Sequence, residues 1–431
     1  MIEALVVILL LVLIALGVEI FVALGACGAL GLILARGPDA LALAATSLFG
    51  QVTTFELLAL PLFVLMGHVL AKTPIGGDLF HLASRWLSWL PGGLAIASVG
   101  ACTVFGAVSG VSVAGVAAIG SMAVPEMLKR GYSVRLAAGS VVCSGALAML
   151  IPPSVPFIIY SAITGESVAK LFIGGIVPGL FIAAALSLYI VVRVILSPGL
   201  TPSRQEVSAT WRERWESLGR VWHVGVLIFL VLGSIYLGVA TPTEASAVGA
   251  AGAFLIAAAV DRNMTPRRIL QILLESMRIS VAILIIMGSA KIFGDFLNMV
   301  RLPQQLTEFM LGWNLPREFM ILAVQALLIL GGMFVDAASL IVVTTPILLP
   351  LIKALGYDPL WYGIVLVINL ELAVVTPPVG LNLYTLRSCV PSLKLEEIVQ
   401  SSIPFLLVEL ACLVFFTLYP PLGLWLPSLM R

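Results

Sequence analysis

The chain has 431 residues, of which 61% are hydrophobic and 10% are charged, and its formal net charge is +1. A soluble domain carries about 25% charged residues, so the composition excludes that class and predicts an integral protein of the lipid bilayer. The net charge also argues against nucleic acid as a partner. The five cysteines lie scattered in apolar segments without metal-binding spacing, so we interpret them as core residues.

The first half of the chain contains six apolar segments. One of them has a Gly- and Ser-rich centre with apolar stretches on both sides that are shorter than the ~20 residues of a full span. We interpret it as a re-entrant helical hairpin, which enters and leaves on one face of the membrane. In chain order, the predicted elements are helices at about 3–19, 21–36 and 55–71, the hairpin at about 93–128, a broken helix at about 134–164 and a last span at about 171–196.

The break in the fifth segment is Pro152-Pro153, and Pro377-Pro378 interrupts a second apolar segment far along the chain. Proline lacks an N–H group and clashes with the preceding turn, so two prolines in a row break a helix. Broken backbone at membrane depth survives only where protein or a water-filled cavity surrounds it. Two broken helices at corresponding places therefore predict the binding site of a transporter.

A mixed-charge segment with two tryptophans joins the halves at about 199–221. It fits either an amphipathic helix on the cytoplasmic membrane surface or a solvated loop. The second half, 222–431, then repeats the first, 1–198. Gly28 matches Gly249 at an offset of 221, and the offset becomes 225 at the two Pro-Pro pairs. The repeated elements are helices at about 222–240, 243–260 and 277–297, a hairpin at about 318–354, a broken helix at about 360–388 and a last span at about 403–425.

Each repeat crosses the membrane five times in this reading, because a re-entrant hairpin makes no net crossing. An odd number of crossings inverts the second repeat relative to the first. With the linker in the cytoplasm, most of the 23 Lys and Arg fall on the cytoplasmic side, as the positive-inside rule requires. The fold class predicted is an all-α polytopic membrane protein of two inverted repeats.

Several motifs, in their order and spacing, resemble the large membrane subunit of tripartite ATP-independent periplasmic (TRAP) transporters over nearly the whole chain. They are Pro125-Glu-Met-Leu-Lys-Arg-Gly-Tyr132, Ile151-Pro-Pro-Ser154, Thr241-Pro-Thr-Glu-Ala245, Asn369-Leu-Glu-Leu372 and Thr376-Pro-Pro-Val-Gly-Leu-Asn-Leu383. The resemblance implies an elevator-type fold in the bacterial inner membrane. It also implies sodium-coupled import of an organic acid, which a periplasmic substrate-binding protein delivers, and a small four-helix membrane subunit as partner.

A sodium ion wants several oxygen ligands, which a hairpin tip and a broken helix facing it can supply. We therefore expect two related sodium sites, one in each repeat. In the first half, Gly and Ser at the tip also fit a role in close helix packing alone. The expected sodium ligands are Ser109, Gly110, Ser112 and Pro152 in the first half, and Asp336, Ser339, Thr376 and Pro377 in the second.

The substrate carboxylate is expected between these sites, at the N-termini of half-helices. The candidates are Ser154, Gly380, Asn382 and Lys291, although Lys291 also has Asp295 within pairing distance along a helix. Asp336 and Glu371 have no acidic counterparts in the first half, where Val111 and Ala146 stand. Glu371, and Glu19, which stands where the family usually has proline, leave proton coupling open.

Enzymatic function is not expected, because the sequence contains no Walker A motif, nucleophile elbow or His-Glu-x-x-His motif. Two alternatives remain. One is a single-component carboxylate carrier driven by sodium or protons, which needs no binding protein. The other is an intramembrane enzyme that uses Asp336 and Glu371 as a carboxylate pair. The sequence does not identify the organic acid or the sodium stoichiometry.

Overall fold

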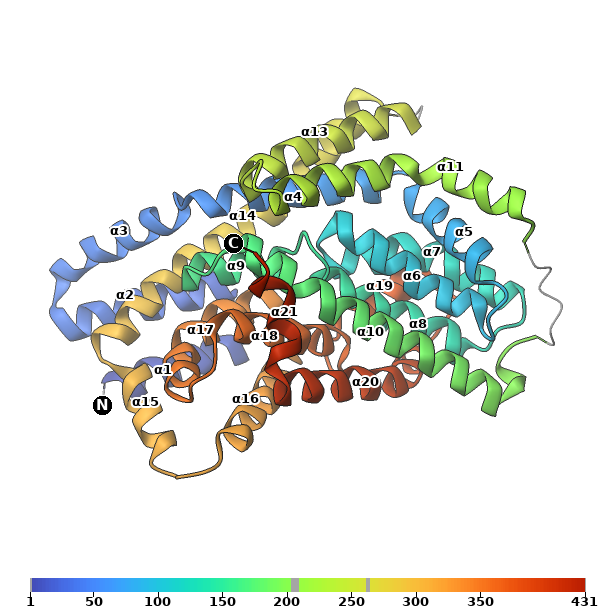
Figure 1. The fold of residues 1–431 in the computed structure, drawn as a ribbon. Helices are drawn as coiled ribbons and strands as arrows, with labels where there is room; N and C mark the ends of the chain where they lie inside the picture. The colour runs from blue at the N-terminus through green and yellow to red at the C-terminus, as the bar shows by residue number, and fades with distance from the viewer. Residues whose placement is uncertain (1, 203–208, 261–263, 431) are drawn as a thin grey trace.

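The computed structural model describes residues 2–202, 209–260 and 264–430, and within these ranges the chain forms helices and short connections without a strand. Residues 203–208 of the predicted linker lie outside them. Figure 1 shows an elongated assembly of helices in which segments from both halves lie against each other throughout. The expectation of an all-helical architecture is confirmed for these residues.

The first half follows the predicted order, with two additions. Both hairpin arms and both parts of the broken helix are present. The elements are α1 (Ile2–Ala15), α2 (Ile20–Arg36), η1 (Pro38–Ala40), α3 (Leu41–Val52), η2 (Phe55–Leu58), α4 (Ala59–Ala71), α5 (Ile75–Leu87), α6 (Gly93–Ser109), α7 (Ser112–Lys129), α8 (Val134–Ala146), η3 (Leu147–Met149), α9 (Val155–Thr164) and α10 (Val168–Leu196).

The second half repeats this order after a short turn, η4 (Pro198–Leu200). One long helix replaces the bent pair α3–α4 of the first half. The elements are α11 (Trp211–Ile228), η5 (Phe229–Gly233), α12 (Ser234–Tyr236), α13 (Pro242–Val260), α14 (Pro266–Met299), α15 (Leu302–Leu311), α16 (Arg317–Gly332), α17 (Ala337–Ala354), α18 (Pro359–Val375), α19 (Leu381–Cys389), α20 (Leu395–Leu418) and α21 (Pro420–Ser428).

The structure departs from the sequence reading at several boundaries. The third helix lies where it was expected, at Phe55–Ala71, but an unpredicted helix, α3, precedes it, and the two helical segments meet at a bend of 54°. The short helices α5 and α15 were not predicted, because their apolar residues alternate with polar ones. The last span was expected to end near 425, but α20 ends at Leu418 because Pro420-Pro421 cannot continue it.

The linker also differs from the prediction. Thr210 and Glu213 form a capping box, in which each side chain accepts a hydrogen bond from the other's backbone N–H, and this box begins α11. From Trp211 the helical segment continues to Tyr236, past the boundary predicted at 221/222. The amphipathic segment is thus the first part of an apolar helical stretch rather than a separate element.

The contacts between helices are reciprocal between the two halves. The helices α2, α4, α13 and α14, which we call the frame, pack as α2 on α14 and α4 on α13. Elsewhere α7, the second arm of the first hairpin, packs on α19. Its counterpart in the second hairpin, α17, packs on α9. The pairs α8–α20 and α18–α10 repeat the pattern. Each broken helix therefore lies between its own hairpin and elements of the other half.

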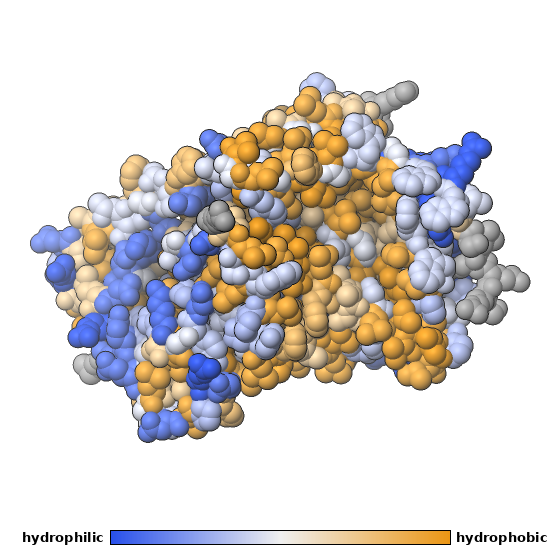
Figure 2. Space-filling view, viewed as in Figure 1, coloured by the Kyte–Doolittle hydropathy of each residue, from blue (hydrophilic) through white to orange (hydrophobic). Residues whose placement is uncertain are grey.

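Among the residues that the structure describes, six helices are long and apolar enough to cross a bilayer, or seven if the bent pair α3–α4 counts as one span. Figure 2 shows hydrophobic residues over the middle of one face and hydrophilic ones mainly toward its left end and upper right. Two ion pairs join segments that are far apart in the sequence. Lys72 pairs with Glu275 at 2.9 Å, and Arg85 pairs with Glu213 at 3.5 Å.

Candidate functional site

The tip of the first hairpin lies against the first helix break. α6 ends at Ser109, and Gly110 follows in the left-handed conformation with φ 64°. A Cβ atom added to Gly110 would lie 2.4 Å from the carbonyl oxygen of Pro153. Only glycine fits here, because the backbone is left-handed and another backbone approaches it closely. The structure thus brings the predicted ligands Ser109, Gly110 and Ser112 to the break.

The break itself consists of residues 150–154, with a cis peptide bond between Pro152 and Pro153. Ser154 begins the second half-helix, α9. Its hydroxyl accepts a hydrogen bond from the N–H of Phe157 at 3.4 Å and donates one to the carbonyl of Met149. Ser154 therefore joins the two half-helices across the break, and its hydroxyl already has two protein partners.

Ser109 is different. Its side chain is buried, and its hydroxyl has no hydrogen-bond partner within the described structure. A buried polar atom without a partner is uncommon and marks a place where an unseen ligand or water can bind. Together with the carbonyl oxygen of Pro153, which lies against Gly110, this oxygen fits the donor set of a small hard cation.

The second hairpin tip is built around Asp336. Its carboxylate accepts hydrogen bonds from the backbone N–H of Ser339 at 3.1 Å and from the Ser339 hydroxyl at 2.5 Å. Asp336 is thus the N-cap of α17. The carboxylate predicted as a sodium ligand also has a structural role, and Ser339, another predicted ligand, is its partner.

The second tip also lies on its own helix break. The N–H of Val379 donates to the carbonyl of Met333 at 3.2 Å. The hydroxyl of Thr376 donates to the carbonyl of Leu372 at 2.6 Å, and a cis bond joins Pro377 to Pro378. The hairpin-on-break arrangement expected from the sequence is therefore present in both halves.

The half-helix α19 begins after Gly380, which is left-handed with φ 46°. Asn382, in its first turn, is fully buried and donates from Nδ2 to the carbonyl of Val142 at 3.3 Å. Val142 belongs to α8, so this predicted substrate residue joins the second break to the broken helix of the first half. The Oδ1 atom of Asn382 has no partner within the described structure.

Lys291 lies elsewhere. It pairs with Asp295 at 2.8 Å, one turn further along α14, and is half-exposed. Both line a cavity of about 460 Å³ between α14 and the body of α17, with Val342 and Pro346 on the hairpin side. Of the predicted site residues, Lys291 is the one that the structure does not place at a tip or a break.

A related cavity of about 550 Å³ lies between α4 and α7, the second arm of the first hairpin. Lys72 and Glu275 lie on its frame side, and Val111 at the first tip borders it. Both cavities therefore separate a frame helix from a hairpin, and each contains one lysine paired with one carboxylate.

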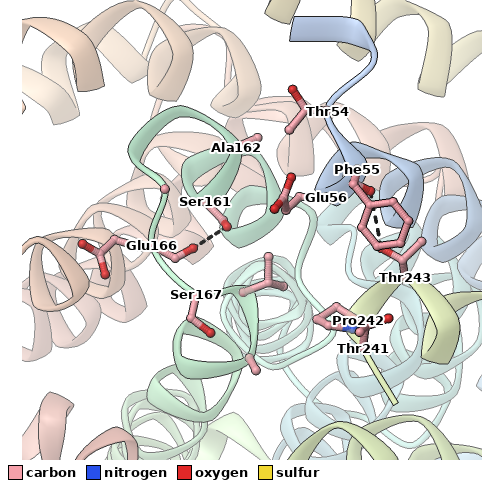
Figure 3. Close-up of a pocket in the computed structure, with 13 residues that line it drawn as sticks. Thr54, Phe55, Glu56, Ser161, Ala162, Glu166, Ser167, Thr241, Pro242 and Thr243 are labelled. Atoms are coloured by element: carbon pink, nitrogen blue, oxygen red, sulfur yellow. Dashed lines mark hydrogen bonds between the residues drawn. The ribbon is translucent and has the colours of Figure 1, made fainter. Parts of the chain in front are cut away.

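A third cavity, of about 360 Å³, lies between η2, the turn from α9 to α10, and the beginning of α13. Figure 3 shows Thr241, Pro242 and Thr243 on one side of it and the segment from Ser161 to Ser167 on the other. Its lining residues include Glu56 and Glu166 but no Lys, Arg or His. This lining does not favour an organic anion.

Sequence reasoning missed one buried acid, Glu409, in α20. Its side chain is 1% exposed, and both of its oxygens lack a hydrogen-bond partner within the described structure. The signal was available, because Glu409 is the only charged residue in the apolar stretch from 398 to 418. The segment Thr241–Thr243 and the ion pair of Lys72 with Glu275 were also not expected at cavities.

Comparisons with known proteins agree on one family. A family model described as "Tripartite ATP-independent periplasmic transporter, DctM component" matches residues 7–422. The chain is 36% identical to the C4-dicarboxylate TRAP transporter large permease protein DctM of Pseudomonas aeruginosa, over 94% of this chain and 93% of that one. It is 34% identical to the isethionate TRAP transporter permease protein DctMQ of Oleidesulfovibrio alaskensis, over 95% of this chain and 64% of that one.

A solved structure also resembles this fold. The YdaH transporter of Alcanivorax borkumensis superimposes with a TM-score of 0.62 and covers 90% of this chain and 89% of its own, at 16% sequence identity. At this identity the likeness concerns the fold alone.

Proposed function

Because the chain belongs to the DctM-component family of tripartite ATP-independent periplasmic transporters, we propose that it imports an organic acid together with sodium ions by an elevator movement. The chain is a large permease subunit of such a transporter and is not an enzyme. The observation that carries the proposal is the pair of hairpin tips, each packed on a helix break.

The two sodium ions would bind at these two tips. In the first half, the free hydroxyl of Ser109 and the carbonyl groups near Gly110 and Pro152 are the candidate ligands. In the second half, the carboxylate of Asp336 adds a full negative charge, and Ser339 and Thr376 add hydroxyl oxygens. Ser112 lies beside the first tip and Pro377 within the second break. Hard cations prefer oxygen ligands of this kind.

The substrate anion would bind between the tips, at the first turns of α9 and α19. Helix N-termini favour negative charge because their N–H groups lack partners within the helix. Ser154 begins α9, and Gly380 and Asn382 begin α19. The two relatives are named for a C4-dicarboxylate and for isethionate, and both compounds are small organic anions. A small organic acid is therefore the proposed substrate class, with Lys291 as a further candidate contact.

Two features support inverted repeats and an elevator movement. The reciprocal contacts between the halves are those expected of two copies related by a two-fold axis. The cavities of about 460 and 550 Å³ also lie where the frame faces the two hairpins, so packing is incomplete along this boundary. In the proposed movement, the hairpins and broken helices carry the substrate past the frame.

The proposed partners are a small membrane subunit and a periplasmic substrate-binding protein, in the inner membrane of a bacterium. The DctMQ relative supports the first partner, because this chain accounts for 64% of its length. Apolar residues such as Leu188, Leu255 and Phe229 are exposed on candidate spans and would face lipid or the small subunit.

Uptake by proteoliposomes tests the proposal. The chain would be reconstituted with the small subunit and the binding protein of the same organism, and the probes would be labelled succinate and isethionate. We expect uptake of at least one probe that requires an inward sodium gradient and the binding protein. Uptake that persists without the binding protein would instead indicate the single-component carrier. Uptake that is indifferent to sodium would overturn sodium coupling.

A further inference from the structure

Two glutamate side chains lie buried in the second half without partners. Glu371 on α18 and Glu409 on α20 are each 1% exposed, and none of their four carboxyl oxygens has a hydrogen-bond partner within the described structure. α18 packs on α20, and the two carboxyls lie near enough to interact electrostatically. They form an acidic pair that has no role in the sodium or substrate sites described above.

The surroundings offer no compensating charge. Within the described part of the chain, no Lys, Arg or His forms an ion pair with either carboxyl. The amide of Gln325 on α16 is neutral and is bonded to Asn369 on the α16 side of α18. The titratable groups on packed elements include Cys412 on α20 and Cys143 on α8. Those at a greater distance along the helices include Tyr189 and Arg193 on α10, Arg135 on α8, and Tyr384, Arg387 and Cys389 on α19.

An ionised carboxylate buried without a partner costs several kcal/mol, and two neighbouring ones cost more. Both side chains therefore carry protons in this buried state. Because a neutral carboxyl ionises again when it meets water, any movement that exposes the pair changes its number of bound protons.

The pair has no counterpart in the first half. Glu371 corresponds to Ala146, at the offset of the Pro-Pro pairs. Counted from the N-caps Ser167 of α10 and Lys394 of α20, Glu409 corresponds to Ile182, which is fully buried. Both equivalent positions are apolar and fully buried, so packing of this fold does not need acids there. Both acids therefore belong to the second half alone.

The candidate route to water is a cavity one helical turn from Glu409, which neither acid of the pair lines. This cavity of about 290 Å³ lies between α8, α10 and α20, and Arg135 and Arg193 line it. Its lining includes Phe405, one turn before Glu409 on the same helix. At the cavity itself α8 and α20 pack tightly, since a Cβ atom on Gly139 would lie 2.3 Å from the carbonyl oxygen of Ser401, which also lines the cavity. A shift of α20 that moves Phe405 would open the pair to this cavity.

We propose that Glu371 and Glu409 form a proton-binding site that couples the transport cycle to protons, in addition to the sodium sites at the tips. The proposal rests on the transport function proposed above. With the pair buried, each carboxyl holds a proton. When the elevator movement exposes the pair on one side of the membrane, the carboxyls release their protons to water there and become carboxylates. For net coupling they take up protons again from water on the opposite side.

A sodium ion is a poorer occupant of this site than a proton. Hard cations take about six oxygen ligands, whereas the pair offers four carboxyl oxygens among cysteine and apolar side chains. No group of three or more metal-binding side chains was found in the described residues. The proton therefore fits the chemistry of the site better.

Infrared spectroscopy of the purified full-length chain tests the site without any substrate. We expect the carbonyl stretch of protonated carboxylic acids at neutral pH, reduced in Glu371→Gln and in Glu409→Gln. The control Glu126→Gln removes an exposed acid that pairs with Arg130 at 2.7 Å, and it should leave the band unchanged. A wild-type spectrum without this band would overturn the proposal even if neither variant folds.

Uptake into proteoliposomes that contain a pH-sensitive dye tests the coupling. If only the protonated pair can be buried, wild-type uptake at alkaline pH should fall by about tenfold per pH unit for each proton that the exposed pair has released. Glutamine is always neutral, so the double variant should keep uptake at alkaline pH and lose the accompanying change of internal pH. An alkaline decrease that both proteins share would overturn the proposal. Absence of wild-type uptake would instead count against the proposed function, and the infrared result would still stand.

Discussion

The two hairpin tips begin and end their helices by different means. In the first half, the left-handed Gly110 makes the tip and α7 begins without a side-chain cap, whereas Ser154 caps the half-helix after the break. In the second half, Asp336 caps α17 at the tip, whereas the half-helix after the break follows the left-handed Gly380. Each half thus has one glycine and one capping side chain, with their places exchanged.

This exchange gives the two tips different oxygens. The first tip offers an unpartnered hydroxyl and backbone carbonyls, which attract a cation only at short range. The second offers a carboxylate, whose charge acts over a longer distance. The two halves therefore share the backbone arrangement of tip and break but differ in the oxygen groups that the tips offer. Two sodium sites at these tips should differ in their affinity for sodium.

The largest effect is expected from Gly110→Ala. The new Cβ atom would meet the carbonyl oxygen of Pro153 at 2.4 Å, so the tip and the break must separate. A displacement of about 1 Å in a binding site can cost roughly 100-fold, and we expect sodium-driven uptake to fall by about this factor. The measurement is uptake in proteoliposomes, with the thermal stability of the purified protein alongside.

Gly356→Ala is the matched control. Gly356 is also left-handed, with φ 79°, but no atom lies within 4 Å of an added Cβ. Both variants therefore introduce a backbone strain of about 1–2 kcal/mol. Only Gly110→Ala also pushes the hairpin tip away from the helix break. Equal losses of uptake in the two variants would show that strain alone, and not the contact of tip with break, is responsible.

At the second tip, Asp336→Asn removes the negative charge of the side chain but keeps its ability to cap α17. Asparagine caps helices as well as aspartate does, so stability should change little. If the carboxylate binds sodium, the sodium concentration for half-maximal uptake should rise by about 10- to 100-fold, the range for losing a charged ligand. Asp336→Ala should add the loss of the cap, about 1 kcal/mol.

Asp358→Asn is the control for this change. Asp358 caps α18 in the same half and accepts a hydrogen bond from the N–H of Leu360 at 2.7 Å, but it lies at the far end of the broken helix from the tip. Its substitution should leave sodium dependence unaltered. An unaltered sodium dependence in Asp336→Asn as well would limit Asp336 to its capping role.

The elements that the sequence predicted best are those with local chemical signals. Both hairpins and both broken helices lie within a few residues of their predicted bounds, because Gly, Ser and Pro-Pro mark the places where helices must stop. The helices α5 and α15 were missed because the prediction of helices relied on long apolar segments, and short amphipathic segments resemble loops by that criterion.

The details of the site depend on contacts between distant segments, which one sequence does not display. That Gly110 meets Pro153, or that Asn382 reaches Val142, follows from packing and not from spacing. The capping role of Asp336 was within reach of the sequence, since Ser339 follows at the interval of an N-cap. The unpartnered state of Ser109 becomes visible only in the folded structure.

A smaller effect is expected from Ser109→Ala at the first tip. Removing a buried hydroxyl without a partner relieves a desolvation cost, so the protein should be as stable as the wild type or slightly more stable. If the hydroxyl binds sodium, the half-maximal sodium concentration should rise by about three- to tenfold. This change is smaller than at Asp336, as the comparison of the two tips requires.

Ser98→Ala is the control on the same helix, because the hydroxyl that it removes has a hydrogen-bond partner. Ser98 is equally buried, but its hydroxyl donates to the carbonyl of Leu94 at 3.0 Å. Its removal should lower stability by about 1 kcal/mol and leave sodium dependence unchanged. If Ser109→Ala destabilised the protein like Ser98→Ala, its hydroxyl would have a partner, and the cation site at the first tip would lose its main support.

The smallest effect is expected at the lysines of the two frame cavities. Lys291 pairs with Asp295 and Lys72 with Glu275, and both pairs are partly exposed to solvent. Exposed pairs contribute about 0–1 kcal/mol, so Lys291→Gln and Lys72→Gln should each change the KM for succinate by less than about fivefold. A much larger increase in KM for Lys291→Gln alone would place the substrate anion at this cavity, away from the tips. The half-helix N-termini would then not be the anion site, and the two halves would differ in substrate binding as well as in their sodium ligands.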